Sequence, residues 1–370
     1  MENRSDPLVS VILPVFNGGR YLEDAVRSIM AQQYRKLEIV AIDDGSTDES
    51  LPILRKLRRE ETRMRLVSRP NRGLIETLNE GIALASGDLI ARMDADDVSY
   101  PERIARQVEA FRERPSLGLC GTDFHVIHRK GVHASGLQPW PDGDLAVLSL
   151  FFTVFRHSTV MFNRRVLKPG QLRYDPGYPH AEDFELFRRI SGAHESRIIQ
   201  QPLLGYRVHD GSVSKTAAKA MRRSHLKIVC ENLRALGVEV AVPALMEDEP
   251  VPEAALDDMV RLAELTLRLP ASRPASERAA FQVGCTNLFF FLREMALHEF
   301  GAGLAARFLD RAQGWGYMRR REVYLLKTLK GAPVLARFAW ASLETVDRMQ
   351  TRVWVEPSFA HADAKPLGAT

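Results

Sequence analysis

Three aspartates follow an apolar segment, and their spacing is the strongest chemical signal in the sequence. Residues 89–93 have the character of a buried strand, and Asp94, Asp96 and Asp97 come directly after them. Carboxylates this close repel one another, and each raises the pKa of the next. A hard divalent cation such as Mg²⁺ or Mn²⁺ relieves that repulsion and commonly also holds substrate phosphates. The alternative is a solvated acidic turn, because Asp is common in turns.

Length and composition describe an ordinary globular protein with room for two or three domains. Of 370 residues, 45% are apolar and 26% charged, and the net charge of +4 is too small to indicate a nucleic-acid partner. Cys120, Cys230 and Cys285 lie far apart, which argues against disulfides and zinc and fits a reducing cytosol. The sequence shows neither a signal-peptide core nor a run of about 18 apolar residues. We therefore expect a cytoplasmic protein, at most peripheral at the inner face of the membrane.

Strand-like and helix-like segments alternate along the first half of the chain. The first helical run places Leu22, Ala25, Val26 and Ile29 on one face. The expected strands are residues 9–13, 37–42, 65–67, 88–93, about 117–127, 158–162 and 203–209, and the expected helices include 21–30, 74–85 and 181–190. Strands separated by helical segments predict βαβ units and an α/β fold with a Rossmann-like, mostly parallel sheet flanked by helices.

Polar clusters follow four of these strands. They cover residues 14–17, 43–48, 69–73 and 94–97. In parallel sheets, ligands bind beyond the carboxyl ends of the strands. We therefore expect the four clusters to line a single binding crevice.

The four clusters match, in order and spacing, the motifs of a known family. The sequences VILPVFN (11–17), IDDGSTD (42–48), NRG (71–73) and MDADD (93–97) resemble those of bacterial-type family 2 glycosyltransferases with the GT-A fold, over about residues 8 to 214. The resemblance implies an inverting, metal-dependent enzyme that moves a sugar from a nucleotide-diphospho-sugar to an acceptor hydroxyl. A UDP-sugar is the expected donor, and cell-surface polysaccharide or glycoconjugate biosynthesis is the expected role.

The resemblance assigns a nucleotide pocket to the first three clusters. Asp44 would accept a hydrogen bond from the base, commonly uracil, and Pro14 and Phe16 would line the base pocket. Asn71 and Arg72 belong to a loop that helps to cover the nucleotide in the family. Without the family, the same clusters would indicate turns and helix caps.

The metal implied by the resemblance is Mn²⁺ or Mg²⁺. Asp96 would ligate it, Asp94 would share it or approach the ribose, and Asp97 would support the cluster or cap a helix. His209 would reach the metal or the diphosphate, and Arg207 beside it suits phosphate oxygens. The metal neutralises charge that grows on the leaving diphosphate.

Two acids open the helix expected at 181–190. By themselves, Glu182 and Asp183 are typical of a helix start, where the helix dipole favours negative charge. In the family, the matching aspartate takes the proton from the acceptor hydroxyl, because direct displacement needs a base opposite the leaving group. Asp183 is therefore the expected base and Glu182 the second candidate. His157 lies where the family has an acceptor-side strand, and it is as readily a packed side chain.

One position departs from the family pattern. Many relatives carry an arginine or lysine where this chain has Thr77 and Leu78. If that cation faces the donor, Arg72 or Arg92 must replace it.

The character of the chain changes beyond residue 214. We expect residues 1–214 to form the catalytic domain, 215–355 an α-helical domain that contacts the acceptor, another subunit or the membrane, and 356–370 a mobile tail. Residues 301–340 carry eight basic and two acidic side chains among aromatic ones. This pattern is typical of a solvated basic helical face and also suits peripheral contact with an anionic membrane surface.

Two other functions share parts of the pattern. A catalytically inactive GT-A scaffold acting through its helical half would be expected to have lost its acids, whereas the candidate acids are all present. Residues 94–98 also spell the Asp-x-Asp-x-Val signature of haloacid dehalogenase-like phosphatases, whose nucleophile lies on the opening strand. Here the motif arrives on the fourth strand. A glycosyltransferase with a nucleotide-sugar donor and a glycan, lipid-linked or other hydroxyl acceptor is the leading hypothesis.

Overall fold

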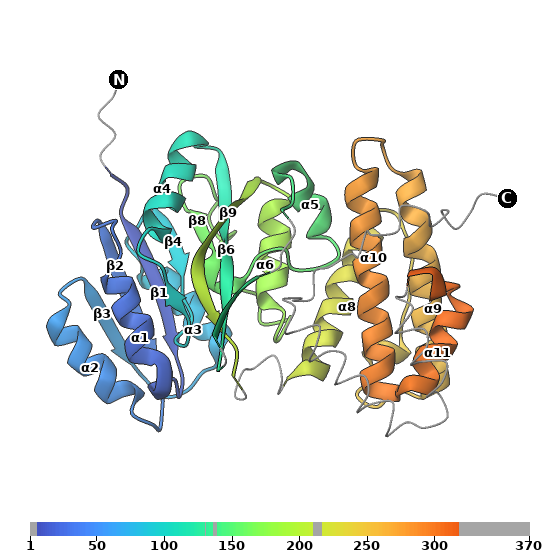
Figure 1. Ribbon diagram of the computed structural model, residues 1–370, viewed down its shortest axis with the longest axis horizontal. Helices are drawn as coiled ribbons and strands as arrows, with labels where there is room; N and C mark the ends of the chain where they lie inside the picture. Colours follow the sequence, from blue (N-terminus) through green and yellow to red (C-terminus); the bar gives the residue numbers. More distant parts are fainter. Residues whose placement is uncertain (1–5, 130, 136–138, 210–216, 318–370) are drawn as a thin grey trace. The chain divides into compact units, whose positions relative to one another are not determined.

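The computed structural model describes residues 6–129, 131–135, 139–209 and 217–317, which form two compact units (Figure 1). The first unit takes in the described residues of Met1–Ser135, Pro139–Ala146 and Thr153–Ala218. The second takes in Val147–Phe152 and the described residues from Lys219 onward. Our assignment of residues 1–214 and 215–355 to separate functions stays a prediction, and the tail expected at 356–370 lies outside the described residues.

A mixed sheet forms the core of the first unit. Its order is β3-β2-β1-β4-β8-β6-β9-β5, and β7 pairs with β6 (Figure 1). The strands are β1 (Val9–Val15), β2 (Leu37–Asp43), β3 (Met64–Ser68), β4 (Leu89–Arg92), β5 (Val98–Ser99), β6 (Leu117–His128), β7 (Gly131–Ala134), β8 (Met161–Asn163) and β9 (Glu195–Arg207). β3, β2, β1 and β4 run parallel, whereas β8 runs antiparallel to β4 and β6. The mostly parallel arrangement that the sequence predicts therefore holds for the half that begins the chain.

Helices pack on both halves of this sheet. They are α1 (Gly19–Met30), α2 (Ser50–Glu60), α3 (Leu74–Leu84) and α4 (Arg103–Glu113), with α6 (Glu182–Ser191) following later in the chain. The buried residues of α1 are the four that the helical spacing predicts. α3 packs closely on β1, because a Cβ at Gly81 would lie 2.4 Å from the side chain of Ile12.

The register of the parallel strands brings their carboxyl ends to one edge. Val15 of β1 lies opposite Asp43 of β2, which in turn lies opposite Ser68 of β3. On the other side of β1, Ile12 lies opposite Arg92, the last residue of β4. The four polar clusters follow these ends directly, so the sheet gathers them as expected.

Two later strands differ from the expected ranges. Residues 157–159 form a 3₁₀ turn, in which the N–H of Thr159 donates to the carbonyl of Arg156 at 2.9 Å, and β8 starts only at Met161. β9 begins at Glu195, well before the expected start, because it pairs along the whole of β6. It ends at Arg207, so that His209 lies beyond the strand.

The second unit is helical (Figure 1). Its main helices are α8 (Ala218–Ala235), α9 (Pro252–Arg268), α10 (Arg278–Met295) and α11 (Ala302–Arg311), with a π-helical turn at Ala296–Phe300. Two basic residues of α11 pair with acids of α9: Arg307 with Glu253, and Arg311 with Asp257. Residues 318–340 of the predicted basic segment lie outside the described residues. Among the helices that are described, none is long and apolar enough to cross a membrane.

Candidate active site

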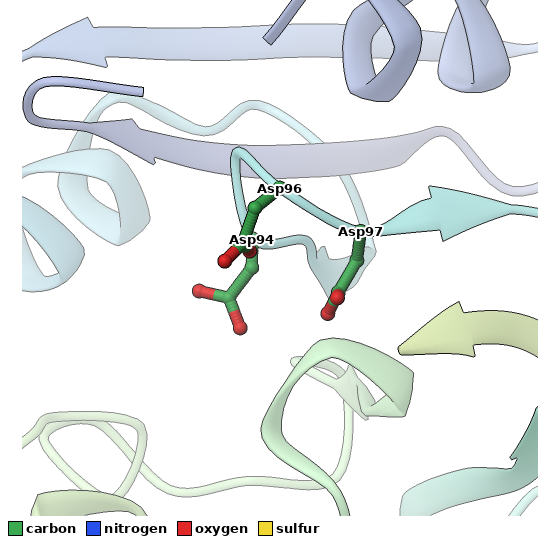
Figure 2. A group of neighbouring side chains, drawn as sticks. All are labelled: Asp94, Asp96 and Asp97. Carbon is green, nitrogen blue, oxygen red and sulfur yellow. The ribbon is translucent and has the colours of Figure 1, made fainter. Parts of the chain in front are cut away.

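Residues 94–97, which we call the acidic turn, bring three carboxylates together directly after β4. One carboxylate oxygen from each of Asp94, Asp96 and Asp97 lies within 4.8 Å of the others. Figure 2 shows the three side chains projecting from the same turn. The residue after Asp97 begins β5, so Asp97 does not cap a helix, which was one of its two expected roles. Charges this close need positive partners in the folded protein.

Arg92 neutralises one member of the acidic turn. This arginine is 3% exposed, forms an ion pair with Asp94 and donates to Ser158 Oγ at 2.9 Å. Ser158 Oγ in turn donates to Asp94 Oδ2 at 2.5 Å. Burial alone would raise the pKa of Asp94, but the charge and hydrogen bonds of Arg92 and Ser158 hold it below its usual value. Asp94 is therefore ionised and held in one orientation.

The end of β9 and the residues directly after it hold the other side of the acidic turn. His209 Nε2 lies 2.9 Å from Asp96 Oδ2, and Arg207 Nε donates to the backbone oxygen of Asp96 at 2.8 Å. The backbone N–H of Arg207 donates to Asp97 Oδ1 at 2.8 Å. The ring of Tyr21 supports both residues, since its centroid lies 4.4 Å from Arg207 Cζ and 5.2 Å from the ring centroid of His209. Two residues singled out in the sequence, Arg207 and His209, thus meet the acidic turn.

Asp97 carries an unsatisfied buried oxygen. The residue is 1% exposed, and its Oδ2 has no hydrogen-bond donor among the described residues. Burial, and then the charges of Asp94 and Asp96, raise the pKa of Asp97 to about 8. A buried carboxylate oxygen without a donor, beside two further carboxylates, is an environment that a hard divalent cation stabilises. The residues present therefore fit Mn²⁺ or Mg²⁺.

Asp44, directly after β2, holds the loop that follows β3. It is 3% exposed, and its carboxylate accepts hydrogen bonds from the backbone N–H groups of Arg72 at 2.8 Å and Gly73 at 3.0 Å. The side chains of Asn71 and Arg72 are exposed. The loop is thus fixed through its backbone, which leaves these two side chains accessible to a ligand.

Arg69 is the cation at this end of the sheet, and our sequence reasoning missed it. It pairs with Asp44 and, at 2.6 Å, with Glu80, and its Nη2 donates to Thr77 Oγ1 at 3.0 Å. Thr77 is one of the two positions where the resemblance implies a cation, and Arg69, directly after β3, brings a guanidinium to that position. The available signal was its place directly after a strand, beside the expected nucleotide loop.

The base-pocket residues have different environments. Phe16, directly after β1, leaves 55% of its surface exposed, whereas Pro14 is buried within the strand. At Gly45 (φ +74°) a Cβ would lie 2.6 Å from the backbone nitrogen of Asn71. A glycine at this left-handed position therefore allows the loops after β2 and β3 to approach closely.

Glu182 and Asp183 begin α6, as predicted. Asp183 Oδ1 accepts a hydrogen bond at 2.7 Å from the N–H of Phe184, which lies in the first helical turn. Glu182 is 6% exposed, and burial together with the charge of Asp183 raises the pKa of Glu182 to about 7. Burial also raises the pKa of Asp183. A raised carboxyl pKa favours a general base that works near neutral pH.

A hydrogen-bonded pair, His157 and Tyr174, packs against α6. The hydroxyl of Tyr174 lies 2.8 Å from His157 Nε2, and Asn79 exchanges two hydrogen bonds of 2.9 Å with the tyrosine backbone. Burial, and then the charge of Arg92, lowers the pKa of His157 well below its usual value, so the ring is neutral. The His157 ring also lies 5.8 Å from that of Phe187. His157 is therefore a packed side chain, and Tyr174 was not predicted.

The acidic turn and the acidic pair Glu182 and Asp183 share one electrostatic environment. The buried charge of Arg92 lowers the pKa of Asp94 and also acts to lower the pKa of Asp183 and Glu182. The acidic turn and the start of α6 therefore both lie within the influence of this one buried charge.

The fold and this site define a class of protein: the chain is a glycosyltransferase of the GT-A fold. The Staphylococcus aureus protein TarS, residues 1–349, solved in complex with UDP-GlcNAc, superposes with a TM-score of 0.52 at 16% identity. The match covers 82% of this chain and 89% of that one. The α/β fold with a helical C-terminal part that the sequence predicts is thereby confirmed.

Sequence comparisons place the chain within the class. The profile described as Glycosyl transferase family 2 matches residues 10–168. An uncharacterized glycosyltransferase of Haemophilus influenzae is 30% identical over 256 residues, 65% of this chain and 79% of that protein. A chondroitin synthase of Escherichia coli is 28% identical over 63% of this chain, which spans 34% of that longer protein. The chain belongs to glycosyl transferase family 2.

Proposed function

We propose that this glycosyltransferase is inverting and metal-dependent, and that it moves a sugar from a UDP-sugar to a hydroxyl of a glycan, lipid-linked or other acceptor. The acidic turn carries the proposal: three carboxylates lie together, and one buried oxygen of Asp97 lacks a donor among the described residues. The UDP-GlcNAc bound by TarS supports a UDP-sugar as the donor.

The nucleotide would bind at the carboxyl ends of β1, β2 and β3. A carboxylate offers about four acceptor positions, and in Asp44 three are taken, by Arg69, Arg72 and Gly73. The remaining position suits the N–H of a nucleobase such as uracil. The exposed ring of Phe16 offers a surface for the base to stack on, and the exposed side chains of Asn71 and Arg72 would cover the nucleotide. Buried Pro14 would act only by shaping the end of β1.

A divalent cation would be held by Asp96 and Asp94, with Asp97 and His209 completing the set. The support is the close approach of the three carboxylates and the contact between His209 and Asp96. Oxygen ligands suit both Mg²⁺ and Mn²⁺, and an imidazole favours Mn²⁺. When bound, the cation supplies positive charge to the departing diphosphate. Arg207, fixed against the acidic turn, would add a second positive group.

Asp183 would take the proton from the acceptor hydroxyl, with Glu182 beside it. Inversion needs a base on the face of the sugar opposite the leaving diphosphate. The raised pKa of Asp183 suits proton transfer, because its charged form is poorly solvated. Protonated Glu182 would limit the repulsion between the two carboxyls.

The second unit would contact the acceptor, another subunit or the membrane surface. Peripheral membrane contact through residues 301–340 would depend mainly on residues 318–340, because Arg307 and Arg311 already pair with acids of α9. The wider role we propose is cell-surface polysaccharide or glycoconjugate biosynthesis, which the partial match to a chondroitin synthase supports.

A donor panel tests the proposal. Incubation with UDP-sugars and Mn²⁺ should give slow donor hydrolysis, and Asp183→Asn should abolish transfer while UDP affinity stays near that of the wild type. The matched control, Asp88→Asn, removes an exposed carboxylate that pairs with Arg165. Absence of both hydrolysis and nucleotide binding would favour the inactive scaffold. Loss of UDP affinity in Asp183→Asn would refute its role as the base.

A further inference from the structure

Arg156 is held between two aromatic rings in the first unit. Its Cζ lies 4.5 Å from the ring centroid of Tyr206 on β9 and 5.1 Å from that of Phe124 on β6. The two rings meet edge to face, with centroids 5.9 Å apart. Because β6 and β9 are paired strands, these rings form a rigid support for the guanidinium.

Among the described residues, none offers a hydrogen-bond acceptor to the guanidinium of Arg156. Its Nε is buried without a hydrogen-bond partner, and within the described part of the chain its side chain forms no ion pair. A guanidinium carries five N–H donors in its plane, so a group that stacks on aromatic faces keeps its edge available for a carboxylate or phosphate. Arg156 is therefore preorganised for a planar, two-point contact with an anion.

The arginines described above for the site differ from Arg156, because each has an acceptor for its guanidinium, although Arg92 Nε is likewise without a partner. Arg69 pairs with Asp44, and Arg92 pairs with Asp94. Arg207 is engaged by the backbone of the acidic turn. A part-buried cation without an acceptor is costly unless a ligand supplies the acceptor.

Arg156 acts on the acceptor side of the site. Its charge lowers the pKa of Asp183, the proposed base, which burial otherwise raises. Its chain neighbours Phe155 and His157 both pack on Phe187 of α6, the helix that Asp183 helps to begin. Arg156 nevertheless makes no ion pair with Asp183, so its donors remain for another group.

We propose that Arg156 binds a negatively charged group of the acceptor, either a carboxylate or a phosphate, and so makes the enzyme selective for acidic acceptors. The inference rests on the proposed function, because it needs the acceptor hydroxyl to lie at Asp183. The anionic group would fix the position of the acceptor while the base addresses its hydroxyl.

Three matched probes test this inference: methyl glucoside, methyl glucuronide and methyl glucoside phosphate. Each is titrated, with the donor active in the panel, into wild type, Arg156→Gln, Arg156→Lys and the control Arg112→Gln. Arg112 is exposed and pairs with Asp6. The measured quantity is the probe concentration that gives half of the maximal change in UDP release, together with the Kd for UDP and the thermal midpoint.

We expect the wild type to favour at least one anionic probe over the neutral one. Comparison of the glucuronide with the phosphate probe shows whether the acceptor group is a carboxylate or a phosphate. Arg156→Gln should raise the half-maximal concentration of that probe on the order of tenfold, as expected for lost charged hydrogen bonds. The half-maximal concentration of the neutral probe, the thermal midpoint and the Kd for UDP should stay as in the control. The maximal rate is left out of this comparison, because loss of the Arg156 charge also raises the pKa of Asp183. Arg156→Lys should recover part of the selectivity, since it keeps the charge but loses the planar fork.

Two results would overturn the inference while the proposed function stands. One is a wild type that hydrolyses the donor but treats the three probes alike. The other is an Arg156→Gln variant that binds UDP more weakly, which would place Arg156 at the donor. A wild type that neither binds UDP nor hydrolyses any donor would instead remove the proposed function, and the inference with it.

Discussion

His209 Nε2 lies 2.9 Å from Asp96 Oδ2, a contact between residues 113 positions apart in the chain. It fixes the segment after β9 against the acidic turn. His209→Ala should therefore weaken Mn²⁺-supported UDP binding by about tenfold, the usual effect of losing a group that ligates or orients a metal ligand. Calorimetric titration of UDP with Mn²⁺ measures this. His133→Ala, an exposed change on β7, is the control, and equal affinities in both variants would contradict the assigned role.

Arg69 is a structural as well as an electrostatic partner of Asp44. Arg69→Gln leaves a nearly buried carboxylate without its cation, which should lower the free energy of unfolding by about 3 kcal/mol. Urea unfolding measures the loss, and UDP affinity should fall with it because the nucleotide loop is released. The control is Arg65→Gln, at an exposed position on β3. If both variants unfold at the same urea concentration, the ion pair is unimportant.

Gly45 tests the close approach of the loops after β2 and β3. Gly45→Ala should cost about 1 to 3 kcal/mol of stability, because it combines a left-handed backbone with a steric clash. Gly170 has φ +82° with open space around it, and Gly143 has open space without a positive φ. Gly170→Ala should therefore cost less than Gly45→Ala, and Gly143→Ala the least. UDP affinity should fall in Gly45→Ala alone, and any other ranking would argue against the clash.

Glu182 should make stability depend on pH. The pKa of Glu182 is about 7 in the folded protein, against 4.5 for a fully exposed carboxyl as in the unfolded chain, so between these values the folded protein holds a proton that the unfolded chain has released. Stability from this group therefore falls as pH rises through that window. The variant Glu182→Gln lacks this group and so does not lose stability in this way. Between pH 5 and pH 8, the free energy of unfolding of wild type should therefore fall by about 2 to 3 kcal/mol relative to that of the variant.

Urea unfolding of both proteins at the two pH values measures this difference. Glu76→Gln, which removes an exposed carboxylate on α3, serves as the control. If the stability difference between Glu182→Gln and wild type is the same at both pH values, burial does not raise the pKa of Glu182.

Local features explain what could be predicted from the sequence. The buried face of α1 follows from helical spacing within a few residues, and the acidic turn is contiguous in the chain. The convergence of four clusters follows from the rule that parallel strands share one carboxyl edge. Each of these needs no knowledge of distant contacts.

Residues that act through distant partners were not predictable in the same way. Arg69 reaches Thr77 and Asp44, 8 and 25 positions away in the chain. Tyr174 meets His157 and Asn79, 17 and 95 positions away. Arg156 lies on rings from two strands. β8 is three residues long and pairs antiparallel with both neighbours, so its alternation carries little signal. Such contacts depend on the packing of the whole unit rather than on any local pattern.

The central claim is that the acidic turn holds a divalent cation that anchors the donor diphosphate. The most direct test is the Kd for UDP with Mn²⁺ and with a chelator, for wild type, Asp96→Asn and the control Asp88→Asn. We predict that chelation weakens UDP binding to wild type and control by about tenfold or more, and that Asp96→Asn binds UDP equally weakly in both conditions. A wild type indifferent to Mn²⁺, or an Asp96→Asn variant with the full response to Mn²⁺, would contradict the account.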